Sequence, residues 1–270
     1  MTRVSARDRR EPVPVLPGDP PVDPPADDEE ARFLAAYDLS AFPRPSVTVD
    51  VALLTILDGS FHAALVRRDE QPAMGRWALP GGFVRLDESL EDAVARVLRD
   101  KTGLRDVYTA QLATFGAVDR DPRGRIITVA YFALVPAERL AAELAAGARA
   151  TLARLEVDEE GGNPGPVRAV GSAGTMPLAF DHAAILGQAI GRLRGRLWYA
   201  PDAFALVPDE FTLLDLQETY EAILGRGIDK NSFRRRVLAS GLVFGVGRRR
   251  EGRRSRPAEL FRFNVPADEP

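Results

Sequence analysis

The residues best suited to chemistry lie between Gly82 and Leu104, where acids gather at the start of a predicted helix. Ser89 followed by Asp92 is the pattern of a capping box, so a helix is expected to begin there. Four acids surround that start: Asp87, Glu88, Glu91 and Asp92. Carboxylates suit Mg²⁺, which prefers hard oxygen ligands. The favoured interpretation is simpler, because acids in a first turn are stabilised by the positive end of the helix dipole.

Further along this helix, Val97, Asp100 and Lys101 are three and four residues apart and are expected to project from one side. They offer one aliphatic chain, one carboxylate and one ammonium, whereas magnesium usually takes one or two carboxylates plus substrate phosphates. Lys101 would repel a divalent cation but suits a phosphate. We therefore expect no catalytic residue, no metal ligand and no cofactor.

The elements around this helix predict an α/β domain of mixed strands and helices. Extended segments are expected at Ser46–Leu57, Phe61–Arg67, Trp77–Val84, Val107–Val118 and Ile126–Val135. Asp58-Gly59 is typical of a hairpin turn. Helices are expected at Glu29–Tyr37 and His182–Arg194, with Ala137–Leu155 partly helical and Glu159–Gly174 a glycine-rich loop.

The C-terminal part has the order of a winged helix-turn-helix domain. Thr212 and Asp215 predict a capped helix, Asp229 predicts a cap for a basic helix that ends at Gly241, and strands are expected at 242–246 and 260–265. In this arrangement the second helix lies in the major groove. The candidate DNA-binding residues are Lys230, Asn231, Arg234, Arg235, Arg248, Arg249, Arg250 and Arg253. A merely solvated basic surface is the alternative, and RNA binding is disfavoured because no aromatic stacking platform is visible.

Composition separates the two ends of the 270-residue chain, whose net charge is −3. Residues 1–28 are rich in proline and acids and are expected to be disordered. The span from Arg226 to Arg262 is strongly basic, which indicates a polyanionic partner. The absence of cysteine excludes disulfides and thiolate sites. No apolar leader or membrane-spanning run is found, so a cytoplasmic location with no membrane partner is expected.

The stretch from Gly82 resembles the Nudix box, G-x5-E-x7-R-E-U-x-E-E-x-G-U, in which U is a bulky apolar residue. The residues in register are Gly82, Glu88, Arg96, Leu98, Gly103 and Leu104. The box carboxylates that hold magnesium are replaced by Val97, Asp100 and Lys101. The chain as a whole resembles the NrtR family of Nudix-related transcriptional regulators over most of residues 37–265. The matching stretches are FPRPSVTVDVALLTI, GRWALPGGFV, PLAFDHAAIL and PDEFTLLDLQETYEAILGRGIDKNSFRRRVL.

The resemblance implies a Nudix-fold mixed sheet sandwiched by helices, followed by a smaller winged helix-turn-helix domain. The expected boundaries are a tail at 1–28, a ligand-sensing domain at 29–198 and a DNA-binding domain at 199–270. It implies a homodimeric repressor of NAD-metabolism genes that binds a palindromic site on double-stranded DNA and senses ADP-ribose or a related nucleotide. The alternative is an active, magnesium-dependent hydrolase of ADP-ribose-like substrates.

The expected ligand-binding residues combine cations with aromatic rings. They are Arg67, Arg68, Arg76, Trp77, Phe83, Lys101 and His182, with Phe180 and Asp181 beside the histidine. Arginine suits a diphosphate because its guanidinium binds oxygens in pairs, and an aromatic face can stack on a base. Arg67 and Arg68 alternate along a strand, so only one of them is expected to face the ligand. Trp77 is equally suited to the core, and His182 to capping or packing.

Overall fold

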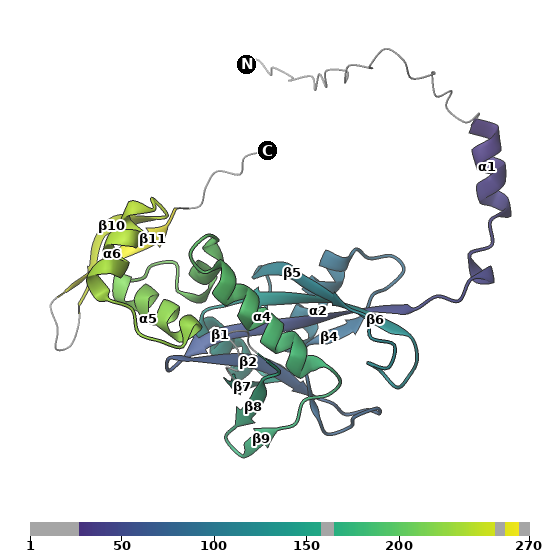
Figure 1. Ribbon diagram of the computed structural model, residues 1–270, viewed down its shortest axis with the longest axis horizontal. Coiled ribbons are helices and arrows are strands. Elements are labelled where there is room, and N and C mark those ends of the chain that lie inside the picture. Colours follow the sequence, from purple (N-terminus) through teal and green to yellow (C-terminus); the bar gives the residue numbers. More distant parts are fainter. Residues whose placement is uncertain (1–26, 158–164, 252–256, 265–270) are drawn as a thin grey trace, which may run out of the picture. The chain divides into compact units, whose positions relative to one another are not determined.

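A computed structural model describes residues 27–157, 165–251 and 257–264 (Figure 1). The described residues before Arg44 form a unit of their own, with helix α1 at Asp27–Ala36 and a 3-10 helix, η1, at Leu39–Ala41. The predicted helix at Glu29–Tyr37 is therefore present, and the predicted boundary after residue 28 falls inside it. The predicted disorder of residues 1–26 lies outside the described residues.

A mixed sheet forms the centre of the second unit. One of its inner strands, β1 (Ser46–Leu57), pairs in parallel with β6 (Ile126–Leu134) and antiparallel with β2 (Ser60–Arg67). The strand order is β5-β6-β1-β2-β7-β8-β9, with β5 at Tyr108–Phe115. Two short strands complete the sheet, β3 (Trp77–Ala78) on β2 and β4 (Gly81–Phe83) on β1. The parallel β1–β6 pair among antiparallel neighbours gives the mixed sheet that the sequence predicted.

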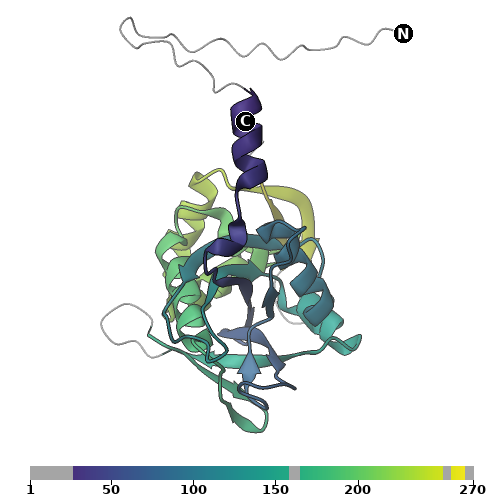
Figure 2. The ribbon, with the colours of Figure 1, turned by 90° about the vertical axis from the view of Figure 1, so that its right-hand side faces the viewer.

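Helices cover both faces of this sheet, as Figures 1 and 2 show for α2 (Leu90–Thr102) and α4 (His182–Arg196). Side chains alternate along β1. Val49, Val51 and Leu53 pack with α2 and with α3 (Ala137–Ala145), whereas Ala52 and Leu54 pack with α4. Because both faces are buried, the strand lacks the polar alternation of a half-exposed sheet. Asp50 and Thr48 are polar exceptions on this strand.

Local sequence signals predicted the starts of α2 and α5 and the first turn correctly. Ser89 Oγ accepts the backbone N–H of Asp92 at 3.0 Å, and Thr212 accepts that of Asp215 at 3.1 Å, both in complete capping boxes. Asp58 and Gly59 have φ of 49° and 69° and connect β1 to β2 in two residues. Positive φ at both positions is what a tight hairpin of this type requires.

Three strands were missed. Ala137–Leu155 was predicted to be partly helical, but after α3 the chain forms β7 (Ala150–Glu156) against β2. Within the predicted loop Glu159–Gly174, β8 (Arg168–Gly171) is followed by β9 (Gly174–Met176). Alanine and leucine favour helix locally, and pairing with a distant strand overrides that preference.

The C-terminal part has the predicted winged helix-turn-helix order. A 3-10 helix, η2 (Pro201–Leu206), precedes α5 (Leu213–Leu224), α6 (Lys230–Ala239) and the hairpin of β10 (Val243–Arg250) and β11 (Ala258–Phe263). The hairpin reaches further than predicted: Arg248, Arg249 and Arg250 were assigned to a loop but lie in β10, with Arg249 opposite Glu259. The predicted boundary at 198/199 stays a prediction. No helix in the described part of the chain is long and apolar enough to cross a membrane.

Candidate functional site

A cavity of about 300 Å³ lies where β1, β4, the segment before β6 and the start of α4 meet. Its lining is unusually rich in charge for a space of this size. The charged lining residues are Asp50, Arg68, Glu70, Lys101, Arg120, Asp121 and Arg123, and the rings of Phe83, Phe180 and His182 also line the cavity. Four cations among these face three acids, so the cavity favours an anionic ligand.

Arg120 holds the acids of the cavity in place. Its guanidinium donates to both carboxylate oxygens of Asp181, at 2.9 and 2.7 Å, and reaches Asp50 at 3.5 Å. The Arg120 side chain is 4% exposed. Asp50 packs closely on β4, because a Cβ placed on Gly81 would lie 2.2 Å from Asp50 Oδ1. The network therefore depends on a glycine at position 81.

His182 begins α4 and closes one wall of the cavity. Its Nδ1 accepts the backbone N–H of Leu79 at 2.9 Å, and its Nε2 lies 3.7 Å from Asp50 Oδ1. The ring is buried, and burial lowers the pKa of His182 because the charged form loses its hydration. The neutral ring, with Nδ1 as acceptor, fits these contacts. His182 thus packs in the wall beside Asp50.

Two aromatic rings and two arginines form another part of the lining. The guanidinium of Arg68 lies 5.0 Å from the centre of the Phe180 ring. Arg123 lies 5.3 Å from the Phe83 ring and 5.8 Å from the Phe180 ring. Hydrogen bonds from Arg123 lower the pKa of Asp121, so that carboxylate is ionised and pairs with its neighbour. Phe83 is half-exposed, which leaves its ring available to stack on a planar group.

The cavity gathers four of the seven predicted ligand-binding residues: Arg68, Phe83, Lys101 and His182. As predicted, only one of the two neighbouring arginines takes part, since Arg67 is exposed and donates to the carbonyl of Gly75. Arg76 is exposed and outside the lining. Trp77 packs against the apolar core, which is the alternative that the sequence left open. Arg67, Arg76 and Trp77 do not line this cavity, and their role in ligand binding stays a prediction.

The three box positions point in different directions, contrary to the expectation that they share one side of α2. Val97 is buried in the core beside Gly82. Asp100 is half-exposed, pairs with Arg99 at 3.0 Å and is not part of the cavity lining. Lys101 does line the cavity. Asp100 precedes Lys101 by one residue, and one step along a helix changes the side-chain direction by about 100°, which separates Asp100 from the cavity.

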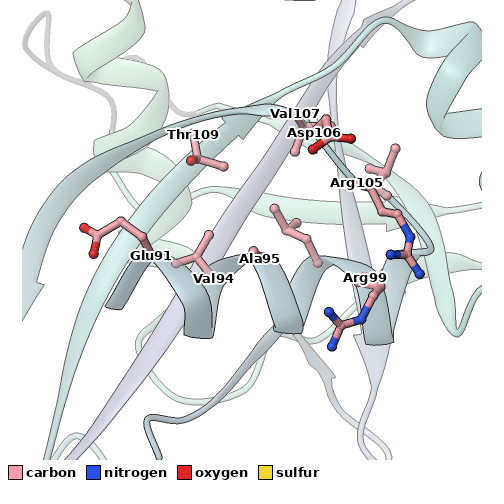
Figure 3. A pocket seen from close by; sticks show the side chains of 10 residues that line it. Glu91, Val94, Ala95, Arg99, Arg105, Asp106, Val107 and Thr109 are labelled. Carbon is pink, nitrogen blue, oxygen red and sulfur yellow. The ribbon is translucent and has the colours of Figure 1, made fainter. Parts of the chain in front are cut away.

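The acids at the start of α2 have other partners. Arg96 binds Glu88 at 2.5 and 2.8 Å, which lowers the pKa of Glu88 to about 2. Asp92 completes the capping box, and Glu91 accepts from the hydroxyl of Tyr131 at 3.1 Å. A separate hollow of about 390 Å³ is lined by α2 and the segment 105–109. Figure 3 shows its lining, with Glu91 and Arg99 on α2 and Arg105 and Thr109 on that segment. Among the described residues no group of three potential ligands could hold a metal ion.

A second candidate surface lies on α6. Phe233 and Val237 are buried, which leaves Lys230, Asn231, Arg234 and Arg235 exposed on the rest of the helix. A groove of about 700 Å³ runs between this helix, α5 and the hairpin. Its lining includes Lys230, Arg234 and Arg249. The structure thus brings the predicted residues of α6 together with one arginine of the hairpin.

The other predicted arginines of the hairpin are engaged within the chain. Arg248 pairs with Glu210, and Arg250 pairs with Asp215 at 2.8 Å. Arg262 on β11 pairs with Glu210 at 2.7 Å. These contacts hold the hairpin against the start of α5. Arg253 lies outside the described residues.

Sequence reasoning missed Asp50, Arg120, Asp121 and Arg123. Asp50 carried a signal, since it is a single acid within the apolar run of a central strand. The segment DRDPRG at 119–124 was expected only as the loop between two strands, although its density of charge was visible. The sequence could not show that Arg120 contacts Asp50, 70 residues away, and Asp181, 61 residues away.

Comparison with known proteins agrees with this architecture. The NUDIX domain family matches residues 47–165, and the family "NrtR DNA-binding winged helix domain" matches residues 203–263. A protein of Acinetobacter baylyi described as "ADPR responsive transcriptional repressor NtrR" is 37% identical over 87% of this chain and 88% of its own length.

Two solved structures are similar over most of the chain. Shewanella oneidensis NrtR complexed with a 27mer DNA is 35% identical, with a TM-score of 0.67 over 81% of this chain and 93% of that one. A MutT/nudix family protein of Enterococcus faecalis is 25% identical, with a TM-score of 0.72 over 89% and 94%.

The fold and the two surfaces define a Nudix-fold protein with a C-terminal winged-helix domain of the DNA-binding type. Sequence identity over most of both chains makes the assignment more specific. The chain belongs to the NrtR family of Nudix-related transcriptional regulators.

Proposed function

We propose that this protein is a transcriptional repressor that binds double-stranded DNA as a homodimer and responds to ADP-ribose. One observation carries the proposal: a small cavity lined by cations lies in the same chain as a helix with an exposed basic face. The description of the Acinetobacter baylyi relative names the same kind of ligand and the same action.

The lining of the cavity suits the charged and aromatic groups of ADP-ribose. Arg68 and Lys101 are available for the diphosphate, and guanidinium groups bind phosphate oxygens in pairs. Phe83 offers an aromatic face for the adenine. Hydrolysis requires a metal cluster that polarises the phosphate and generates the nucleophile. Val97 and Lys101 cannot ligate a metal ion, so the proposed role is binding without turnover.

The basic face of α6 suits the major groove. Its cations are exposed, and Phe233 and Val237 hold the helix to the rest of the winged domain. Phosphate contacts position such a helix, and contacts with base edges provide specificity. Lys230, Asn231, Arg234 and Arg235 are the proposed groove residues, with Arg249 beside them.

The DNA-binding half is tested with a duplex that the protein selects from a random library. Arg234→Ala with Arg235→Ala is expected to weaken binding and to lower the salt slope by about 1.8, since each lost phosphate contact removes about 0.9. Arg248→Ala is the matched control, because Arg248 is engaged by Glu210 and is expected to change the slope much less. Binding by the double variant with unchanged affinity and slope would reject the proposed interface.

The sensing half is tested by thermal unfolding with ADP-ribose, since a ligand that binds the folded state raises the melting temperature. ADP-ribose is expected to raise it and to change the affinity for the selected duplex. Rapid magnesium-dependent turnover of ADP-ribose, together with no binding to duplex DNA, would favour the hydrolase instead.

A further inference from the structure

The Nudix box implies a magnesium site, and the residues of this chain do not fit that ion. Magnesium takes hard oxygen ligands in near-octahedral geometry. Of the three box positions, Val97 is in the core, Asp100 lies outside the cavity with Arg99, and Lys101 carries a positive charge. The box therefore presents no carboxylate to the cavity.

The remaining acids of the cavity, Asp50, Asp121 and Glu70, do not replace the missing ligands. Glu70 is a single exposed carboxylate at the edge of the lining. Asp50 is bound by Arg120, and Asp121 accepts from Arg123 Nη2 at 2.7 Å. A divalent ion at either carboxylate would have to displace a guanidinium or lie beside it. Both cost free energy, because like charges repel strongly in a partly desolvated site.

Lys101 differs from Arg120 and Arg123 in having no carboxylate partner in the described part of the chain. It is half-buried in the last turn of α2, where the negative end of the helix dipole favours a cation. Arg68 is similar, since its hydrogen bonds go to the carbonyls of Pro72 and Glu70. Two positive charges of this cavity are therefore not neutralised by ion pairs.

We propose that Lys101 supplies the charge that a divalent ion would otherwise supply, so that the cavity binds a nucleoside diphosphate without magnesium. The ammonium has three donors for phosphate oxygens, and Arg68 adds a second cation. Magnesium in solution reduces the charge of a free diphosphate, so it is expected to leave binding unchanged or to weaken it. The inference rests on the proposed function, because it uses ADP-ribose as the ligand.

The experiment is calorimetric titration of the full-length protein with ADP-ribose, once in EDTA and once in excess Mg²⁺. The wild type is expected to bind equally well, within about twofold, in both buffers. Lys101→Met is expected to bind roughly tenfold more weakly or worse in both, as for the loss of a charged hydrogen bond. Lys101→Glu is expected to lose binding in EDTA and to recover part of it with Mg²⁺, whereas Lys101→Arg retains metal-independent binding.

Arg99→Met is the matched control, because Arg99 lies on the same helix, faces the separate hollow and is not part of the cavity lining. It is expected to bind as the wild type does. A wild type that needs Mg²⁺, or a folded Lys101→Met variant with unchanged affinity, would overturn the inference and leave the proposed repressor intact. A wild type that binds ADP-ribose in neither buffer would overturn the proposed ligand as well.

Discussion

The cavity and the basic face of α6 both use cations, but they hold them in different ways. In the cavity Arg120 is buried and bonded to Asp181 and Asp50, and Arg123 is bonded to Asp121. On α6, Lys230, Arg234 and Arg235 are exposed and form no ion pair within the described residues. A small ligand needs groups already in position, whereas a DNA backbone rewards accessible charge that displaces counterions.

The hairpin combines the two arrangements. Arg248 and Arg250 are tied to Glu210 and Asp215, whereas Arg249, which lies between them, lines the groove beside α6. Successive residues of a strand point to opposite sides, so one face of β10 fastens the hairpin and the other faces the groove. This difference separates the arginines that pair within the chain from the one that we propose for DNA binding.

The largest expected effect on stability comes from Arg120→Met. The substitution leaves Asp50 and Asp181 without their buried partner, and breaking such a pair costs about 3–5 kcal/mol. The free energy of unfolding, measured by urea denaturation, should fall by that amount. Arg234→Met provides the contrast, because an exposed substitution is expected to change stability by no more than about 0.5 kcal/mol. Equal losses in the two variants would remove the distinction between the two regions.

The next effect concerns the face of α6 that packs against the rest of the domain, opposite its exposed basic face. Trp198, just after α4, lies edge-on to Tyr220 and Phe233, and Arg236 lies 3.9 Å from the centre of its ring. Trp198→Ala should lower the free energy of unfolding by about 2–3 kcal/mol through loss of these contacts.

A double-mutant cycle isolates the contribution of Arg236. Arg236→Ala alone should cost about 0.5–1 kcal/mol, and it should cost nothing further in the Trp198→Ala background. Unfolding by denaturant supplies all four values. Fully additive losses would show that the contact between Arg236 and Trp198 contributes no stability.

The difference between contacts of residues near in sequence and contacts of distant residues explains what the sequence could predict. Capping by Ser89 and Thr212 involves residues three positions apart, so a short pattern predicts it. The strand β7 depends on pairing with β2, about 90 residues earlier in the chain, and its alanine and leucine content favours helix instead. Local propensity therefore failed where a long-range ladder decided the structure.

In the candidate site, too, the features set by local periodicity could be predicted, whereas the contacts between distant residues could not. The periodicity of a strand predicted that only one of Arg67 and Arg68 faces the ligand, and the cation at Lys101 was predicted from its helix. The partners Asp50, Arg120 and Asp181 come from three elements, and only the folded sheet brings them together. The spacing of Asp100 and Lys101 misled, because one step along the helix moves a side chain by about 100°.

A third prediction concerns the pH dependence of the cavity wall. Burial lowers the pKa of His182 below the value of about 6.5 expected for the unfolded chain. As the pH falls below that value, the unfolded state binds the proton before the folded state does. The free energy of unfolding therefore decreases with falling pH until the pH reaches the pKa of His182 in the folded state. The slope from this residue should be at most about 1.4 kcal/mol per pH unit.

Denaturant unfolding between pH 7 and about pH 5 measures this slope. His182→Asn should flatten it, because the amide oxygen can still accept from the Leu79 N–H but does not titrate. His62→Asn changes the other histidine of the chain and should keep the slope. A slope that survives in His182→Asn would place the titrating group elsewhere.

The smallest effect tests whether the contact between the hairpin and the start of α5 depends on the cap of that helix. Thr212 caps α5, and its partner in the capping box, Asp215, also holds Arg250. Thr212→Ala should lower the free energy of unfolding by about 1 kcal/mol, whereas Thr212→Ser keeps the hydroxyl and should cost much less. Because Asp215 would lose part of its support, Thr212→Ala should also loosen the hairpin, seen as faster amide exchange in β10. Unchanged exchange with the expected loss of stability would mean that Glu210, paired with Arg248 and Arg262, is sufficient to hold the hairpin.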